Sequence, residues 1–256
     1  PNLYGSNPEL DVEDFKKMFK DGDFMPDELK VYPCSLISSA ELMSYYKKGL
    51  WKPYEEDELL YVLKEAYKNA PAYCRITRMI RDIGSQDIVT GNKKTNLRQL
   101  VEKELTEAKS KIQEIRFREI RNQKVKKDDL EIKIVEYETS ISKEYFLEYV
   151  TKENLIAGFL RLSLPKEKES HFMEELKNSA MIREVHIYGE SVEIGNLLSG
   201  KAQHLGLGKA LIKKAEEIAK ENNFKKISVI SSIGTRSYYS KLGYKLENLY
   251  QTKKLN

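Results

Sequence analysis

Apolar residues recur with a helical period in the first part of the chain, most clearly over residues 8–20. Val12, Phe15, Met18 and Phe19 fall on one side of a helix there, because residues three and four positions apart share a face. The pattern also predicts a strand at residues 29–35, a helix at 39–48 with Ser39 as its N-cap, and a helix at 55–69. Residues 1–70 thus form one or two strand–helix units, too few for a complete α/β domain, and we expect segments on the N-terminal side to complete the sheet.

The last part of the chain, residues 131–256, alternates apolar strands with amphipathic helices. Its expected strands cover residues 131–139, 143–151, 155–163, 181–188, 226–230 and 244–253, and its expected helices cover residues 208–222 and 235–242. A polar turn at residues 151–154 lies between two apolar runs, which is the pattern of a β-hairpin. The fold class that follows is α/β, with a mixed sheet of mainly antiparallel strands.

A basic region separates these two parts. Residues 75–127 contain 15 Lys and Arg against 7 Asp and Glu, although the whole chain has a formal net charge of only +4. Residues 75–82 and 112–125 alternate apolar and basic residues, with a helix expected at 96–111 between them. Charge-paired arginines on a solvated face would explain such a run, and contact with nucleic acid would explain its one-signed excess. The candidate nucleic-acid-binding residues are Arg75, Arg78, Arg81, Lys93, Lys94, Arg98, Arg116, Arg118 and Arg121.

Cysteine content and hydropathy limit where the protein can act. Cys34 and Cys74 supply neither a disulfide framework nor a C-x-x-C metal motif, so we expect a reducing, cytoplasmic setting. No apolar run approaches the roughly 18 residues of a membrane span, and no signal peptide is evident, so no membrane partner is expected. The chain begins with Pro rather than Met, which is typical of a processed or trimmed polypeptide.

The run Q-H-L-G-L-G at residues 203–208 places two glycines at the start of the expected helix 208–222. Unpaired N–H groups at such a turn, with the positive end of the helix dipole behind them, hold a pyrophosphate without a charged side chain. A Cβ at Gly206 or Gly208 would hinder the approach of the phosphate oxygens. The Q-x-x-G-x-G spacing differs from dinucleotide and triphosphatase loops and resembles the turn by which GNAT-type N-acetyltransferases hold acetyl-CoA.

Several ordered motifs carry a wider resemblance. They are R-E-V-H-I-Y-G at 183–189, the glycine turn at 203–208 and I-G-T-R-S-Y-Y-S-K-L-G-Y at 233–244, with P-N-L at 1–3, D-E-L-K-V-Y-P at 27–33 and N-L-R at 96–98 upstream. Over nearly its whole length the chain resembles the catalytic subunits of Elongator. The resemblance implies the C-terminal part of a radical S-adenosylmethionine-type α/β barrel at residues 1–70, a basic linker at 71–130, and a GNAT-type acetyltransferase domain at 131–256, whose mixed sheet has flanking helices.

The resemblance implies an acetyl-CoA-dependent tRNA acetyltransferase that acts on the wobble uridine, in the first step of its carboxymethyl modification. The basic linker would hold the anticodon stem-loop, and attachment to a ring carbon would require radical chemistry. In full-length members that chemistry uses S-adenosylmethionine and a 4Fe-4S cluster, whose three-cysteine motif is absent here, so we expect a fragment without the cluster-binding region. No zinc site is expected either, because Glu114 and Phe117 stand where some members have linker cysteines.

The resemblance also implies residue roles. The strand residues Glu184, Val185, His186 and Ile187 would pair with the pantetheine arm as a further strand would, and Gly206, Leu207, Gly208, Lys209 and Ala210 would hold the pyrophosphate. Tyr238 and Tyr239 would flank the thioester, where a hydroxyl can protonate the leaving thiolate. Consecutive helical residues point about 100° apart, so we expect at most one buried tyrosine. Tyr239 is our candidate for cofactor contact and Tyr238 for the tRNA side, with His186, more often a structural histidine, and Glu184 as alternatives for proton transfer.

Two other functions remain open at this stage. A protein lysine N-acetyltransferase needs only direct attack of an amine on the thioester. A non-catalytic RNA-binding scaffold could keep an acetyl-CoA pocket as a sensor. The sequence does not decide the tRNA species, the oligomeric state, the presence of accessory subunits or the activity without the cluster region.

Overall fold

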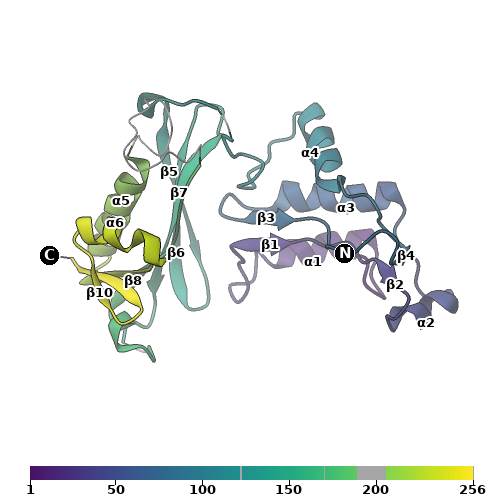
Figure 1. Cartoon of the computed structure of the whole chain (residues 1–256), viewed down its shortest axis with the longest axis horizontal. Coiled ribbons are helices and arrows are strands. Elements are labelled where there is room, and N and C mark those ends of the chain that lie inside the picture. Colours follow the sequence, from purple (N-terminus) through teal and green to yellow (C-terminus); the bar gives the residue numbers. More distant parts are fainter. Residues whose placement is uncertain (122, 170, 189–205, 256) are drawn as a thin grey trace. The chain divides into compact units, whose positions relative to one another are not determined.

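Two units with separate hydrophobic cores make up the chain in this computed structural model, Pro1–Arg118 and Glu119–Asn256 (Figure 1). The structure describes residues 1–121, 123–169, 171–188 and 206–255. The expected boundaries at residues 70 and 130 differ from this division. Residues 71–118, most of the expected linker, belong to the first unit, and residues 119–130 belong to the second.

The first unit is built from short strands and four helices. In chain order these are α1 (Pro8–Lys17), β1 (Glu28–Lys30), β2 (Leu36–Ile37), α2 (Leu42–Lys47), α3 (Glu56–Asn69), β3 (Arg75–Arg78), β4 (Ile88–Thr90) and α4 (Leu97–Glu107). β1 pairs with β3 in parallel, and β2 pairs with β4 antiparallel. The single strand expected at residues 29–35 is therefore two short strands, with β1 ending at Lys30 and β2 beginning at Leu36.

Helix starts in this unit follow capping chemistry. The Asn7 side chain accepts the Leu10 N–H at 2.9 Å at the beginning of α1, and Glu55 and Glu58 form a capping box at the beginning of α3. The prediction of Ser39 as a helix N-cap was wrong. α2 begins at Leu42 with Glu41 at its N-cap, because residues 38–40 form a turn before the helix.

The core of the first unit joins α3 to the segment that follows it. Residues of α3 on one face, at the spacing of a helix, meet buried residues of β3 and α4. The buried apolar residues that residues 71–118 contribute are Ile76, Met79, Leu97, Val101, Leu105 and Ile112. Much of the expected basic linker is therefore part of a packed core. Its second alternating run, residues 112–125, forms a turn at 115–118 and a bridge of Glu119 with Ile156 instead of a regular strand.

The second unit is a seven-stranded sheet with helices, which confirms the predicted mixed sheet. Its strands are β5 (Glu131–Glu138), β6 (Ser142–Val150), β7 (Ile156–Pro165), β8 (Ser179–Ile187), β9 (Lys226–Ile230), β10 (Lys245–Glu247) and β11 (Tyr250–Lys254), and its helices are α5 (Leu207–Glu221) and α6 (Arg236–Lys241). Across the sheet the order is β10-β11-β9-β8-β7-β6-β5. Neighbours run antiparallel except β8 and β9, which are parallel. The strand predicted at residues 244–253 is divided into β10 and β11 by a turn at Asn248, whose φ is 51°.

Helix α5 lies along one face of this sheet (Figure 1). Its buried residues Leu211, Ala215 and Ile218 recur at intervals of three and four, so one face of the helix is apolar. They pack against Leu160 and Ile182 of the sheet. Across the part of the chain that the structure describes, no helix combines the length and apolarity needed to cross a membrane.

Candidate functional site

Strands β8 and β9 separate halfway along β8. Their parallel register runs from Ser179 opposite Lys226 to Ile182 opposite Val229. β8 continues to Ile187, and over that stretch β7 is its partner, with Phe159 opposite His186 and Gly158 opposite Ile187. The printed register with β9 ends at Ile182, and an extended ligand could pair with this edge of β8 as a strand does.

The first turn of α5 lies beside this separated segment. Gly206 is the N-cap at a φ of 70°, and the first N–H groups of a helix have no carbonyl partner within the helix. A Cβ on Gly206 would meet nothing within 4 Å, so its backbone conformation, and not crowding within the protein, is what favours glycine there. Lys209 is exposed and Ala210 half-buried on the same turn. Residues 203–205 of the glycine motif lie outside the described residues.

Gly208 is the point where three segments meet. A Cβ on Gly208 would lie 3.2 Å from the Tyr238 hydroxyl oxygen and 3.6 Å from Cγ1 of Ile187. The end of β8, the first turn of α5 and the start of α6 therefore converge at this residue. Of the predicted cofactor-contacting residues, Ile187, Gly208 and a tyrosine are brought together, and the tyrosine is Tyr238.

The two tyrosines have different surroundings, as the 100° spacing on a helix predicts. Tyr239 is 7% exposed and packs with Tyr244 in the core, whereas Tyr238 is 39% exposed. Burial raises the pKa of both phenols, and it raises that of Tyr239, with a smaller contribution from Tyr238, to about 12. Both hydroxyls are therefore protonated at neutral pH. Of the two hydroxyls, that of Tyr238 is among the atoms nearest to Gly208.

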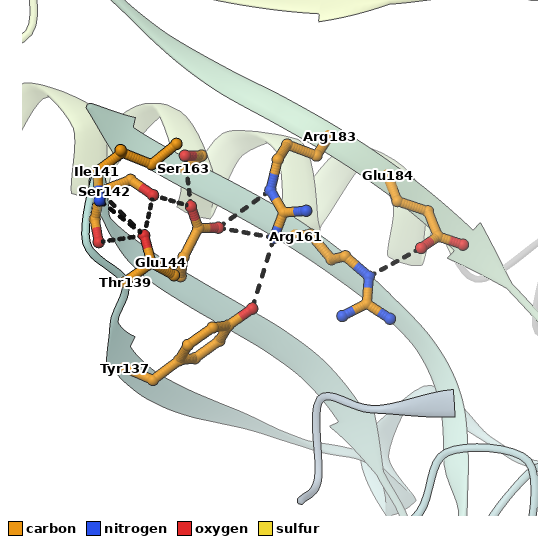
Figure 2. A network of polar contacts seen from close by, with 9 residues as sticks. All are labelled: Tyr137, Thr139, Ile141, Ser142, Glu144, Arg161, Ser163, Arg183 and Glu184. Carbon is orange, nitrogen blue, oxygen red and sulfur yellow. Dashed lines mark hydrogen bonds and ion pairs between the residues drawn. The ribbon is translucent and has the colours of Figure 1, made fainter. Parts of the chain in front are cut away.

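The opposite face of the sheet carries Glu184 and His186. Arg161 lies directly across from Glu184 in the β7–β8 register, and its Nε donates to Oε2 of Glu184 at 2.9 Å (Figure 2). The Arg161 guanidinium is 5.2 Å from the ring centres of Phe146 and of Phe159, and its side chain is only 2% exposed. The two aromatic rings and the carboxylate of Glu184 stabilise this buried cation. Arg161 in turn holds the Glu184 carboxylate in place.

His186 continues the same stack. Its ring is parallel to that of Phe159, with centres 5.7 Å apart and planes 8° apart, and lies 4.4 Å from the ring of Tyr188. The alternation that placed His186 opposite the apolar residues Val185 and Ile187 is confirmed, because those two residues pack toward the α5 core. Sequence reasoning missed Arg161, since an arginine in a buried strand has no periodic signal beyond its being polar.

A second polar cluster lies on this face near the other end of β8 (Figure 2). The buried carboxylate of Glu144 accepts hydrogen bonds from Ser142 at 2.6 Å, from Ser163 at 2.5 Å and from Arg183 at 2.7 Å. Sequence reasoning missed this cluster as well. A cavity of about 530 Å³ adjoins it, with Ser163 and Arg183 in its wall. Its wall takes Ser179, Met181 and Arg183 from β8 and none of the three residues that meet at Gly208, so it is separate from that convergence.

The predicted nucleic-acid-binding residues divide by their surroundings. Three of them satisfy backbone carbonyls or side chains inside the first unit: Arg98 donates to Tyr67 and to the Ile76 carbonyl, Arg116 to the Thr77 carbonyl, and Arg118 to the carbonyls of Gln113 and Ala72. Three pair with carboxylates: Arg75 with Glu28 at 3.9 Å, Arg78 with Asp82, and Lys94 with Glu56 at 2.5 Å. Arg121 is exposed. Arg81 and Lys93 are exposed and, among the described residues, have no carboxylate partner.

Glu114 and the two cysteines bear on whether the first unit can bind an iron–sulfur cluster. Glu114 is fully buried and accepts the N–H groups of Ile76 at 2.6 Å and of Phe117 at 2.7 Å. Burial raises its pKa, and these hydrogen bonds oppose the rise. Cys74 is buried and Cys34 half-buried, and with two cysteines in the whole sequence the three thiolates of a radical-enzyme cluster are not available. The residues present therefore do not fit an iron–sulfur cluster.

A strand that separates from its parallel neighbour beside a helix N-terminus, in a mixed sheet of this order, is typical of a GNAT-type acetyltransferase unit. Residues 180–254 match the Acetyltransferase (GNAT) domain family, and residues 26–107 match the Radical_SAM C-terminal domain family. The chain is 39% identical to the tRNA uridine(34) acetyltransferase of Methanocaldococcus infernus and 34% identical to the Elongator complex protein 3 of Saccharomyces cerevisiae. Over its whole length the chain is similar to these proteins, as the sequence motifs predicted.

The alignments cover a larger share of this chain than of the relatives. Each of the two alignments covers 100% of the chain but only 49% and 47% of the relative, so the chain spans about half the length of the curated relatives it matches. A solved structure of the archaeal Methanocaldococcus infernus Elp3 with an N-terminal deletion is 36% identical and superposes with a TM-score of 0.88, covering 100% of the chain and 62% of that structure.

Proposed function

We propose that the second unit binds acetyl-CoA at the separated end of β8 and that the chain serves a tRNA acetyltransferase acting on the wobble uridine. The observation that carries the proposal is the convergence of Ile187, Gly208 and Tyr238 from three segments. A strand edge that can pair with an extended arm and a helix N-terminus that can hold a pyrophosphate adjoin each other there. We call this convergence the cradle. A Cβ at Gly208 would crowd it, so glycine leaves room there for the close approach of a ligand.

The chain's own residues would divide the work as follows. The β8 backbone from Glu184 to Ile187 would align the pantetheine arm, and the N–H groups of Leu207, Gly208 and Lys209 would face the pyrophosphate. Acetyl-CoA supplies an activated acetyl thioester. Tyr238, protonated at neutral pH, would donate its proton to the thiolate sulfur as that bond breaks. Tyr239 would support the site from within the core. This assigns the cofactor-facing hydroxyl to Tyr238, where the sequence favoured Tyr239.

The relatives and the exposed cations of the basic region at residues 75–127 support an RNA substrate. Related proteins are named for acetylation of uridine 34 in tRNA, and that substrate is proposed for this chain. Exposed cations of the first unit, Arg81 and Lys93 foremost, would contact the anticodon stem-loop. Attachment of an acetyl group to a ring carbon needs radical chemistry with S-adenosylmethionine and a cluster, and we assign no part of that step to these residues. Accessory subunits are proposed because one group of relatives is named Elongator complex protein 3.

Two measurements test the proposal. Calorimetric titration of the chain with acetyl-CoA, and of Gly208→Glu as the matched variant, should show binding that the variant loses, because a carboxylate would occupy the pyrophosphate position. Release of free thiol should be followed with tRNA and, separately, with a lysine-containing peptide. Stimulation by tRNA supports the RNA substrate. Stimulation by the peptide alone, with its acetylation, would instead assign a lysine N-acetyltransferase.

A further inference from the structure

Three cations that are distant in sequence surround one small hollow in the first unit. Arg81 follows β3, whereas Lys93 and Lys94 follow β4, and all three line the hollow together with Ser35, Asn92 and Thr95. We refer to this hollow as the Arg81–Lys93 notch. Its volume is about 40 Å³. A hollow of this size would take a compact group such as a phosphate.

The fold brings the two loops together by a close backbone approach. β2 pairs with β4, with Leu36 opposite Thr90, and the chain then turns at Gly91 with a φ of 110°. A Cβ on Gly91 would lie 3.1 Å from the Cys34 carbonyl oxygen and from Cα of Ser35, so only glycine lets the loop pack this closely. The loop that carries Lys93 is therefore held against Cys34 and Ser35, and Ser35 lines the notch together with Arg81.

Hydrogen bonds hold the shape of the lysine loop. The hydroxyl of Ser35 donates to the Asn92 carbonyl at 3.4 Å. The Asn92 side chain accepts the Lys94 N–H at 3.2 Å and donates to the Lys94 carbonyl at 3.1 Å. Lys93 sits between these two anchored residues, so its position in the loop is set by its neighbours.

The charge of the notch is incompletely balanced. Glu56 pairs with Lys94 at 2.5 Å, and Asp82 pairs with Arg78. Arg81 lies over the ring of Tyr32 at 5.9 Å from the ring centre, an arrangement that leaves its guanidinium edge available. Within the described ranges neither Arg81 nor Lys93 has a carboxylate partner. Two exposed cations thus flank a hollow that a phosphate would fill and neutralise.

We infer that the Arg81–Lys93 notch binds one backbone phosphate of the RNA substrate. The inference rests on the proposed tRNA function and adds to it a single anchoring point. Arg81 and Lys93 would contact the phosphate oxygens, while Thr95 can donate its hydroxyl. Such a contact fixes the position of the RNA on the first unit without reading its sequence.

Charge reversal with a matched control tests the notch. Arg81→Glu combined with Lys93→Glu should weaken tRNA binding at least five- to eightfold at about 0.1 M salt, and should lower the slope of log affinity against log salt by roughly 0.7–0.9, the effect of one lost phosphate. The control is Lys47→Glu with Lys48→Glu, two exposed lysines of the same unit that carry the same change in charge. The control should bind tRNA within about twofold of the parent.

A geometric variant separates the notch from general electrostatics. Gly91→Ala keeps every charge but strains and displaces the loop, and a folded Gly91→Ala chain should lose affinity as the charge reversal does. Circular dichroism and a thermal melt would establish folding. If the parent binds tRNA and the charge-reversed chain binds like its control, the inferred phosphate site is wrong and the proposed function stands. If the parent itself binds no tRNA, both are wrong.

Discussion

The hydroxyl of Tyr238 and the α-carbon of Gly208 face each other so closely that a Cβ on Gly208 would stand 3.2 Å from the hydroxyl oxygen. The two residues belong to different helices, α6 and α5, with β9 between them in the chain. We propose a phosphate contact at Gly208 and a proton donor at Tyr238, so this relationship joins the two proposed roles. Predictions about the chemistry can therefore be made at each of the two residues.

Removal of the Tyr238 hydroxyl should affect catalysis, whereas removal of the Tyr239 hydroxyl should not. Tyr238→Phe keeps the ring, so acetyl-CoA affinity measured by calorimetry should change little. The tRNA-stimulated release of thiol should fall by roughly 10²–10⁴-fold, the effect of a lost general acid. Tyr239→Phe is the matched control, because it removes a hydroxyl from the adjacent, buried position. Parental rates in both variants would show that neither hydroxyl donates the proton, and Glu184 and His186 would be examined next.

The two glycines of the α5 turn should respond to alanine in opposite ways. Gly208→Ala adds a helix-favouring residue and should leave the melting temperature unchanged or higher, yet should weaken acetyl-CoA binding, because its Cβ enters the cradle. Gly206→Ala has open space around it but a φ of 70°, so it should lose about 1–2 kcal/mol of stability. Thermal melts and titrations of both variants check this. A Gly208→Ala chain that binds acetyl-CoA with parental affinity would argue against the cradle.

Alkaline pH should destabilise the second unit. Burial raises the pKa of Tyr239 to about 12 and raises that of Tyr244, which donates to Glu216 at 3.0 Å, further still. An unfolded tyrosine titrates near 10, so above that pH the unfolded chain binds fewer protons than the folded one, and the free energy of unfolding falls from pH 10 to 12. Urea denaturation at pH 8.5 and 11 should show the loss. Tyr239→Phe should reduce it, and an unchanged pH dependence in that variant would place its cause elsewhere.

The carboxylate of Glu114 should not be replaceable by an amide. Its two oxygens accept separate N–H groups, from Ile76 and from Phe117, whereas the amide of Glu114→Gln offers a single acceptor. One buried N–H would then lack a partner, at a cost of roughly 1–3 kcal/mol in the free energy of unfolding. Urea denaturation measures the difference. The exposed Glu107→Gln is the control and should cost less than about 1 kcal/mol. Equal stabilities would mean that the turn relaxes around the amide.

Local pattern was enough to predict most elements of this chain. The strand expected at residues 226–230 is β9 (Lys226–Ile230), and the helix expected at 55–69 is α3 (Glu56–Asn69). Both have a clear apolar period over their whole length, and a capping residue marks the start of α3. Short elements were less predictable, as at Ser39, because a single capping residue does not determine where a turn becomes a helix.

The sequence by itself predicted the class of site, since the glycine turn, the strand before it and the tyrosine pair are local motifs. Only the tertiary structure decided which residues meet. It buried Tyr239 and brought Tyr238 to Gly208, directed Arg98 and Arg118 toward internal carbonyls, and placed Lys93 beside Arg81 through the backbone approach at Gly91. The physical reason is that a side chain's periodic position predicts its face on its own element. Its partners depend on how elements distant in the chain pack, which no local period records.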